Sequence, residues 1–248
     1  MERDYFKKYY KIEREHWWFK VRSKILMNVL RYKLKGFSNL SILNIGVATG
    51  KTSELLNEFG TVLSVEYDEE SFEFCRDILN MNIIKASILN LPISNNTYDL
   101  VCAFDVLEHV SEDQFAWNEM VRVCKPGGFV FVSVPMYEIL WSIHDSINQH
   151  VRRYSRKTLH SLINKMQGEI LISHFFNSIL FLPIFVARII LRLFSTKKVN
   201  KISDFERIDN SFINFLFYSI FNLEVSLLKY LSFPFGISYL LLWKKNSI

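Results

Sequence analysis

The stretch ILNIGVATGKTSELL, residues 42–56, joins an apolar segment to a glycine-containing loop and then to a helical segment. A strand, a glycine loop and a helix in this order are typical of nucleotide-binding sheets, because the loop backbone and the helix N-terminus can approach a ligand closely. Two classes of ligand remain open at this point. They are the phosphates of ATP or GTP, and the adenosine half of a sulfonium cofactor.

The spacing around the loop separates these ligands. A phosphate-binding loop has the pattern GxxxxGK[ST], but Gly46 and Gly50 enclose three residues, one fewer than that pattern needs. Glu66 follows 20 residues after Gly46, at the end of the next apolar segment. A carboxylate there accepts hydrogen bonds from two ribose hydroxyls, and Ala48 breaks the GxGxxG pattern of dinucleotide sites. The sequence therefore predicts a nucleoside site.

The hydrophobic periodicity predicts strands that alternate with helices, which indicates an α/β fold with a parallel sheet and helices on both faces. The expected helices cover 10–34, 50–58, 69–79 and 112–123, and the expected strands cover 41–45, 61–66, 82–85, 98–104 and 128–134. KPGG at 125–128 is interpreted as the turn into the fifth strand.

Composition and cysteine usage indicate a folded protein of a reducing, cytoplasmic compartment. The chain has 248 residues, half of them hydrophobic, which is enough for one large core. Its first residues show no apolar leader. Cys75, Cys102 and Cys124 lack CxxC spacing and clustered histidines, so the sequence predicts neither disulfides nor a metal site.

Charge is divided unevenly along the chain. Residues 1–35 carry 11 Lys and Arg against 4 acids, residues 40–148 carry 5 against 16, and residues 149–201 carry 10 against 1. Because the basic flanks are rich in aliphatic and aromatic residues, they favour an anionic membrane face or a lipid-like substrate, and no nucleic acid partner is expected. A merely solvated basic surface is the alternative.

Four segments in order resemble the class I S-adenosylmethionine-dependent methyltransferases: ILNIGVATG, VLSVEYD, LNLPISNNTYDLVCAFDVLEHV (89–110) and VRVCKPGGFVFVSVP (121–135). The resemblance covers residues 41–135. It implies a Rossmann-like seven-stranded sheet closed by an antiparallel hairpin, with S-adenosylmethionine as the cofactor. The cofactor contacts that it implies are Gly46 and Gly50 at the methionine end, Glu66 and the following Tyr67 at the ribose, Ser87 and Ile88 beside the adenine, and Phe104 and Asp105 beside the methyl group.

Three positions that the resemblance assigns to the cofactor site depart from the family pattern. Asn44 stands where the family usually has aspartate, Ala48 where it has glycine, and Ser87 where an aspartate commonly meets the adenine. We expect cofactor binding to weaken rather than vanish, because serine still accepts a hydrogen bond. A domain that keeps the fold without catalysis is the alternative.

The segment EREHWWFKVRSKIL (13–26) resembles the N-terminal helix of a methyltransferase branch associated with surface-glycan and lipid-linked sugar synthesis. The resemblance places Arg22 near the methionine carboxylate and Trp17, Trp18 and Phe19 around the sulfonium, where aromatic faces stabilise a cation. Alternatively, these aromatic residues only fasten the helix to the sheet.

The segment WSIHDSINQHVRRYSRKTL (141–159) resembles a second motif of that branch, HxRRY. Methyl transfer to a hydroxyl needs in-line placement and removal of one proton. The residues assigned to this chemistry are His144, Asp145 and His150 as bases, Arg152 and Arg153 as a clamp for phosphate or uronate, and Tyr154 as a pocket wall. Alternatively, the segment only caps a helix and pairs with the acidic middle of the chain. His109 is assigned a structural role.

The C-terminal third predicts a sixth strand at 168–176 and a seventh at 235–245, separated by an apolar helical insertion. Its first segment, 178–194, is interrupted by Pro183 and contains Arg188 and Arg192, which argues against a membrane span. A helix at the membrane interface, with contact through 178–201, or a lid over a substrate channel is expected. A helical pair that covers its own sheet is the alternative.

These observations predict an N-terminal helical cap (1–40), a methyltransferase core (41–176 and 233–248) and the insertion (177–232). The expected reaction is methyl transfer from S-adenosylmethionine to an oxygen of a lipid- or nucleotide-linked glycan, in the cytoplasm or at the inner face of the membrane. A quinone or another small lipophilic acceptor is one alternative. A non-catalytic, membrane-associated binding subunit is another.

Overall fold

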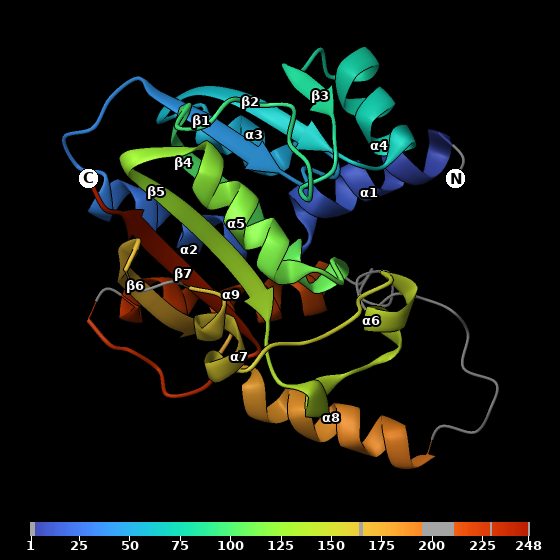
Figure 1. The fold of residues 1–248 in the computed structure, drawn as a ribbon. Helices are drawn as coiled ribbons and strands as arrows, with labels where there is room; N and C mark the ends of the chain where they lie inside the picture. Colours follow the sequence, from blue (N-terminus) through green and yellow to red (C-terminus); the bar gives the residue numbers. More distant parts are fainter. Residues whose placement is uncertain (1–2, 164–165, 195–210, 229, 248) are drawn as a thin grey trace.

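The computed structural model describes residues 3–163, 166–194, 211–228 and 230–247. Within these residues one seven-stranded sheet has the strand order β3-β2-β1-β4-β5-β7-β6 (Figure 1). The first five strands run parallel, and β7 lies antiparallel between β5 and β6, so the expected seven-stranded sheet with its closing hairpin is confirmed. The strands are β1 (Leu40–Ile45), β2 (Gly60–Glu66), β3 (Ile83–Lys85), β4 (Tyr98–Phe104), β5 (Cys124–Pro135), β6 (Gly168–Phe176) and β7 (Ser238–Lys245).

Helices connect and flank these strands. They are α1 (Arg3–Glu15), α2 (Trp17–Lys33), α3 (Lys51–Leu56), α4 (Glu69–Glu73), α5 (Asp113–Val123), α6 (Ile143–Ile147), α7 (Arg156–Ser161), α8 (Phe181–Phe194) and α9 (Ser211–Leu227). The single helix predicted over 10–34 is therefore two. His16 breaks it, because its backbone is extended (φ −70°, ψ 136°) and its side chain accepts the Trp18 N–H as the N-cap of α2.

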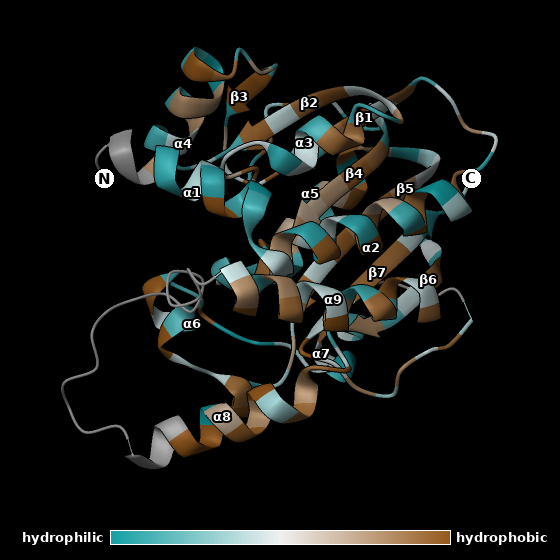
Figure 2. Cartoon of the chain, turned by 180° about the vertical axis from the view of Figure 1, so that it is seen from behind, coloured by the Kyte–Doolittle hydropathy of each residue, from teal (hydrophilic) through white to brown (hydrophobic). Residues whose placement is uncertain are grey.

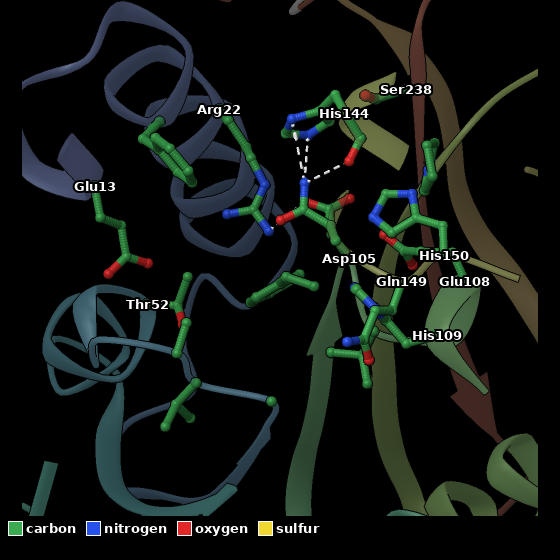
Figure 3. A pocket seen from close by; sticks show the side chains of 18 of the residues that line it. Glu13, Arg22, Thr52, Asp105, Glu108, His109, His144, Gln149, His150 and Ser238 are labelled. Atoms are coloured by element: carbon green, nitrogen blue, oxygen red, sulfur yellow. Dashed lines mark hydrogen bonds and ion pairs between the residues drawn. The ribbon is translucent and has the colours of Figure 1, made fainter. Parts of the chain in front are cut away.

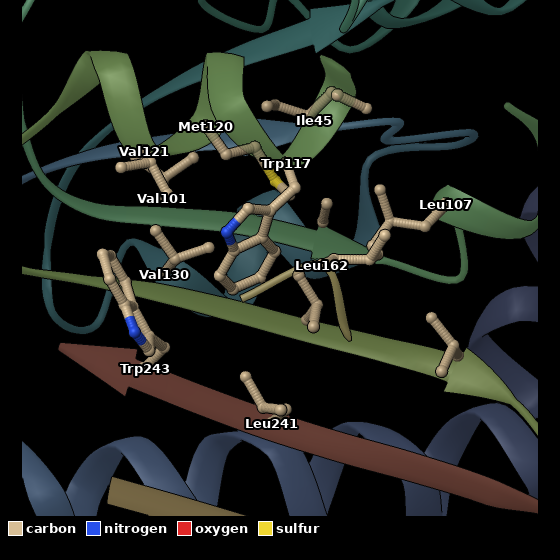
Figure 4. Packing of buried hydrophobic residues seen from close by; sticks show 14 of the residues in the cluster. Ile45, Val101, Leu107, Trp117, Met120, Val121, Val130, Leu162, Leu241 and Trp243 are labelled. Atoms are coloured by element: carbon tan, nitrogen blue, oxygen red, sulfur yellow. The ribbon is translucent and has the colours of Figure 1, made fainter. Parts of the chain in front are cut away.

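Two hydrophobic clusters cover the two faces of the sheet. On one face, Trp117 of α5 packs edge-on against Trp243 of β7, with 5.7 Å between ring centroids (Figure 4). On the other face, α2, α3 and α9 lie against the strands (Figure 2), and Trp17 of α2 contacts Phe217 and Phe221 of α9. Helices on both faces explain why the central strands are apolar throughout.

β5 begins at Cys124, so the KPGG segment is part of the strand and not a separate turn before it. The register between β4 and β5 shifts between Tyr98 and Leu100, which accommodates this irregular start. A Cβ on Gly128 would lie 2.9 Å from the backbone oxygen of Asp99, so the close approach of the two strands needs glycine there.

The insertion between β6 and β7 contains α8 and α9. Buried Glu224 of α9 accepts the backbone N–H groups of Ser178 (2.8 Å) and Ile179 (3.2 Å), which fastens α9 to the end of β6. Pro183 is the third residue of α8, where a missing N–H costs no intrahelical bond, so it does not interrupt the helix as the sequence suggested. Among the helices of the described residues, none is long and apolar enough to cross a membrane.

Candidate functional site

A cavity of about 1030 Å³ opens at the carboxyl ends of β1, β2, β4 and β5 (Figure 3). Helices α1 and α2 line one side, with Phe217 of α9 beside Trp17, and α6 and α8 contribute to the other side. Ligands of open α/β sheets bind at this edge. Small-molecule sites occupy roughly 300–1,000 Å³, so the cavity has room for a cofactor and a second molecule.

The turn after β1 forms the floor of the cavity. Gly46 has φ +70°, and a Cβ there would lie 2.4 Å from Cγ2 of Val106, so only glycine fits this position. Ala48 also has a positive φ, +50°, at a cost on the order of 1 kcal/mol for a residue with a Cβ. The departure from glycine at Ala48 therefore strains the backbone as well as adding a methyl group.

Glu66 holds this turn against the end of β2. Its Oε2 accepts the Ala48 N–H (3.0 Å), and its Oε1 accepts the N–H groups of Tyr67 (2.8 Å) and Asp68 (3.0 Å). Burial raises the pKa of Glu66 above its ordinary value, and the three N–H donors oppose that effect. Since a carboxylate has about four acceptor positions, one remains for a ligand, and not the two that the sequence suggested.

The other residues expected around the nucleoside line the same end of the cavity. Tyr67, Ser87 and Ile88 contribute to its wall, and the Tyr67 side chain is largely exposed. Ser87 Oγ accepts the N–H of Leu89 at 3.2 Å, so its hydroxyl hydrogen remains available to a ligand.

Arg22 and Asp105 face each other across the middle of the cavity. Arg22 Nη2 lies 2.6 Å from Asp105 Oδ2, and the guanidinium lies over the rings of Trp18 (5.2 Å) and Phe104 (5.8 Å). Asp105 has φ +56° directly after β4 and accepts a hydrogen bond from the Ser133 hydroxyl. A methionine carboxylate at Arg22 would therefore share the guanidinium with Asp105.

Two residues assigned to the cofactor have other roles in the described structure. Asn44 lies beneath the loop, where its Nδ2 donates to Thr52 Oγ1 and Ser53 Oγ at 2.9 Å each. Gly50 is the N-cap of α3, where a Cβ would lie 2.4 Å from Sδ of Met81. Both residues shape the loop from behind instead of lining the cavity.

Three histidines, His109, His144 and His150, line the side of the cavity opposite α1, and we call them the histidine wall. Asp145 lies behind them, fully buried, and binds His150 Nδ1 (2.9 Å), Arg153 Nε (2.8 Å) and the Ser142 N–H (2.7 Å). Burial disfavours its charge, but these donors outweigh burial and hold the pKa of Asp145 well below its ordinary value. Asp145 is therefore a positioning residue, and its assignment as a base is wrong.

The HxRRY motif mainly fastens the loop that carries His150. Arg152 Nη1 (2.6 Å) and the Tyr154 hydroxyl (2.7 Å) both donate to Asp113 Oδ2 at the start of α5, away from the cavity. The phosphate-clamp role of Arg152 and the wall role of Tyr154 are therefore wrong. Arg153 does line the cavity, but its Nε is bound to Asp145.

Sequence reasoning missed several residues of the cavity wall. One of them is Glu108, which is fully buried, and this burial raises its pKa well above the ordinary value. His109 beside it also lines the cavity, although the sequence assigned it a structural role. Glu13 of α1 is also buried and accepts a hydrogen bond from the Thr49 hydroxyl. Arg188 of α8 turns into the cavity and donates to the backbone oxygen of Leu140, instead of facing a membrane. The sequence signal that could have indicated Glu108 and His109 is the adjacent acid and histidine in LEHV (107–110).

The strand order and the cavity at the strand ends define the fold of class I S-adenosylmethionine-dependent methyltransferases. Residues 43–132 match the family model described as "Methyltransferase domain". Solved structures of low sequence identity share the fold. A possible histamine N-methyltransferase of Thermotoga maritima has a TM-score of 0.61 at 14% identity, with 98% of this chain and 96% of that chain covered. A putative sarcosine dimethylglycine methyltransferase of Galdieria sulphuraria has a TM-score of 0.59 at 15% identity, with 91% and 86% covered.

Curated relatives match part of the chain. A ubiquinone/menaquinone biosynthesis C-methyltransferase of Citrobacter koseri is 30% identical over 116 residues, which is 43% of this chain and 46% of that protein. A malonyl-[acyl-carrier protein] O-methyltransferase of Buchnera aphidicola is 29% identical over 128 residues, 51% and 52% of the two chains. The chain thus spans about half the length of these relatives. Together the matches imply S-adenosylmethionine as the methyl donor of the domain.

The Glu66→Gln variant tests the nucleoside end. It keeps the shape of the side chain and removes the charge that strengthens a hydrogen bond from a ribose hydroxyl, a bond worth about 1.5–3 kcal/mol. We expect the dissociation constant of S-adenosylmethionine, measured by calorimetry, to rise about ten-fold or more. Glu69→Gln, on the exposed surface of α4, is the control. An unchanged constant in folded Glu66→Gln would contradict the ribose assignment.

Proposed function

We propose that the chain transfers the methyl group of S-adenosylmethionine to an acceptor that combines an apolar part with a polar or anionic end. One observation carries the proposal. A single cavity joins the Gly46–Glu66 floor to the histidine wall and to residues of α8. A cofactor at the floor and an acceptor at the histidine wall would then lie in one cavity, as methyl transfer requires.

The cofactor end suits S-adenosylmethionine. The backbone at Gly46 admits a close ligand, Glu66 has one acceptor position left for a ribose hydroxyl, and Trp18, Phe19 and Phe104 add aromatic faces. Bound there, the cofactor supplies an electrophilic methyl group on a sulfonium. The aromatic side chains favour that positive charge and exclude water from it.

The acceptor end combines apolar and polar groups. Ile184 and Ala187 of α8 and Phe217 of α9 are apolar, while Arg188 and the histidine wall are polar or cationic. A hydroxyl acceptor must also lose one proton, and the histidine wall lines the same cavity as Asp105 at the end of β4. These groups suit a lipophilic molecule with an oxygen-bearing head.

Two acceptor classes meet that description. An isoprenoid quinone precursor is favoured by the apolar lining and by the printed name of the Citrobacter koseri relative. A lipid-linked glycan is favoured by the likeness of segments 13–26 and 141–159 to the glycan branch. The shared feature, an apolar chain joined to an oxygen-bearing head, is the substrate class that we propose.

Incubation with methyl-labelled S-adenosylmethionine and lipophilic acceptors tests the function. We expect label in a quinone precursor or a lipid-linked sugar, detected by intact mass. Ala187→Trp should raise the acceptor KM about ten-fold or more by filling the cavity and leave cofactor affinity unchanged. Met166→Trp is the control, because Met166 is 88% exposed and lies outside the cavity lining. No transfer to any lipophilic acceptor by a protein that binds the cofactor would contradict the proposal.

We also propose that the insertion rests on an anionic membrane surface. On α8, Leu182, Val186 and Ile190 are 65%, 45% and 48% exposed and lie one turn apart. Phe212, Phe215, Leu216, Leu223 and Leu227 extend an exposed apolar stripe along α9. Exposed apolar side chains gathered along a helix suit an interface, and the basic excess of residues 149–201 suits anionic lipid. Lys197, Lys198 and Lys201, and the side chain of Arg192, lie outside the described residues.

Co-sedimentation with liposomes tests this contact. We expect the protein to bind vesicles that contain phosphatidylserine and to be partly released by salt, because burial of apolar surface and charge attraction act together. The triple variant Leu182→Gln, Val186→Gln, Ile190→Gln should lose half or more of this binding. Gln substitutions at Ile78, Phe115 and Met166, which are also exposed, serve as the control. Equal binding by both triple variants would contradict the role of α8.

A further inference from the structure

We propose that Glu108, His109 and His150 form a binding site for one divalent transition-metal ion. One ligand atom from each residue lies within 4.8 Å of the others, at the edge of the cavity. Glu108 and His109 lie in the short 3₁₀ helix Leu107–His109 that follows β4, and His150 lies in the loop after α6, which the fold brings beside them (Figure 3). This inference replaces the sequence-based expectation of no metal site.

The environment of Glu108 favours binding of a cation. Its side chain is fully buried, and within the described part of the chain neither carboxylate oxygen has a hydrogen-bond partner. The two nearby arginines are engaged elsewhere, Arg22 with Asp105 and Arg153 with Asp145. An unpaired buried carboxylate is costly, and a bound cation removes that cost.

Both histidines are oriented as metal ligands are. His150 Nδ1 is bound to the Asp145 carboxylate at 2.9 Å, and the His109 ring hydrogen-bonds the backbone of Asn148, so each ring keeps one nitrogen for an ion. Metal-binding histidines typically donate their second ring N–H to a carboxylate or a backbone carbonyl in this way.

The donor set indicates which ions fit. Two imidazole nitrogens and one carboxylate oxygen suit zinc, manganese, iron(II) or cobalt(II), whereas calcium and magnesium prefer oxygen ligands alone. Three protein ligands leave at least one coordination position for water or for an oxygen of the acceptor. This last role rests on the proposed function, and in it His150 ligates the metal instead of acting as the free base that the sequence suggested.

Metal binding by the full chain tests the site without any methyltransferase assay, so its failure is distinct from failure of the proposed function. After chelator treatment, we expect one equivalent of Co²⁺ to produce a visible d–d absorption band, and Zn²⁺ or Mn²⁺ to raise Tm. Glu108→Gln and His150→Gln should each weaken Co²⁺ binding ten-fold or more. Glu108→Gln should melt near the temperature of the metal-free wild type, because an amide of the same shape replaces the buried carboxyl group, and Zn²⁺ or Mn²⁺ should no longer raise that temperature.

His144→Gln is the matched control. Its ring lies 6.2 Å from that of His150 in the same cavity, but it is outside the cluster, so Co²⁺ binding should remain within two-fold of wild type. Loss of binding in His144→Gln equal to that in His150→Gln would overturn the ligand set. Absence of any Co²⁺ band or thermal shift in folded wild type would overturn the site itself.

Discussion

The hydrogen bonds from three backbone N–H groups to the Glu66 carboxylate are the interaction on which the site depends. They connect the strained turn after β1, at Ala48, to the end of β2, at Tyr67 and Asp68. Without them, the left-handed turn would lose the charge-assisted hydrogen bond at Ala48 that restrains it from the side of β2, and the cavity floor would lose its shape. The one acceptor position of Glu66 that remains is the position available to a ligand. Glu66 therefore both holds the shape of the cavity floor and would bind the ligand.

The opposite side of the cavity is built on a second buried carboxylate. Asp145 accepts hydrogen bonds from His150, Arg153 and the Ser142 backbone, and Asp113 accepts them from Arg152 and Tyr154. The polar groups of the HxRRY residues thus anchor one loop, and this loop holds His150 beside Glu108. Rigid placement of a polar group is what makes it effective toward a ligand. An acceptor meets a preformed wall instead of having to order it.

Much of the fold could be predicted from the sequence, because strand and helix periods and turn residues are local signals. The strands at 98–104 and 168–176 have the predicted bounds, and Glu66 was located by its distance from Gly46. Side-chain roles were less accessible, because they depend on partners distant in the chain. Arg152 looks like a phosphate ligand until Asp113 is seen beside it, and Asp145 looks like a base until three donors surround it. Glu108 was missed because the burial of its carboxylate without a hydrogen-bond partner can be recognised only in the folded structure.

The central claim is that the floor made by Gly46, Ala48 and Glu66 is a cofactor site despite its departures from the family pattern. Calorimetric titration of the purified chain with S-adenosylmethionine measures this directly. The account predicts one molecule bound per chain with a dissociation constant in the micromolar range or tighter, displaced by S-adenosylhomocysteine. A folded protein that binds neither molecule at millimolar concentration would contradict it.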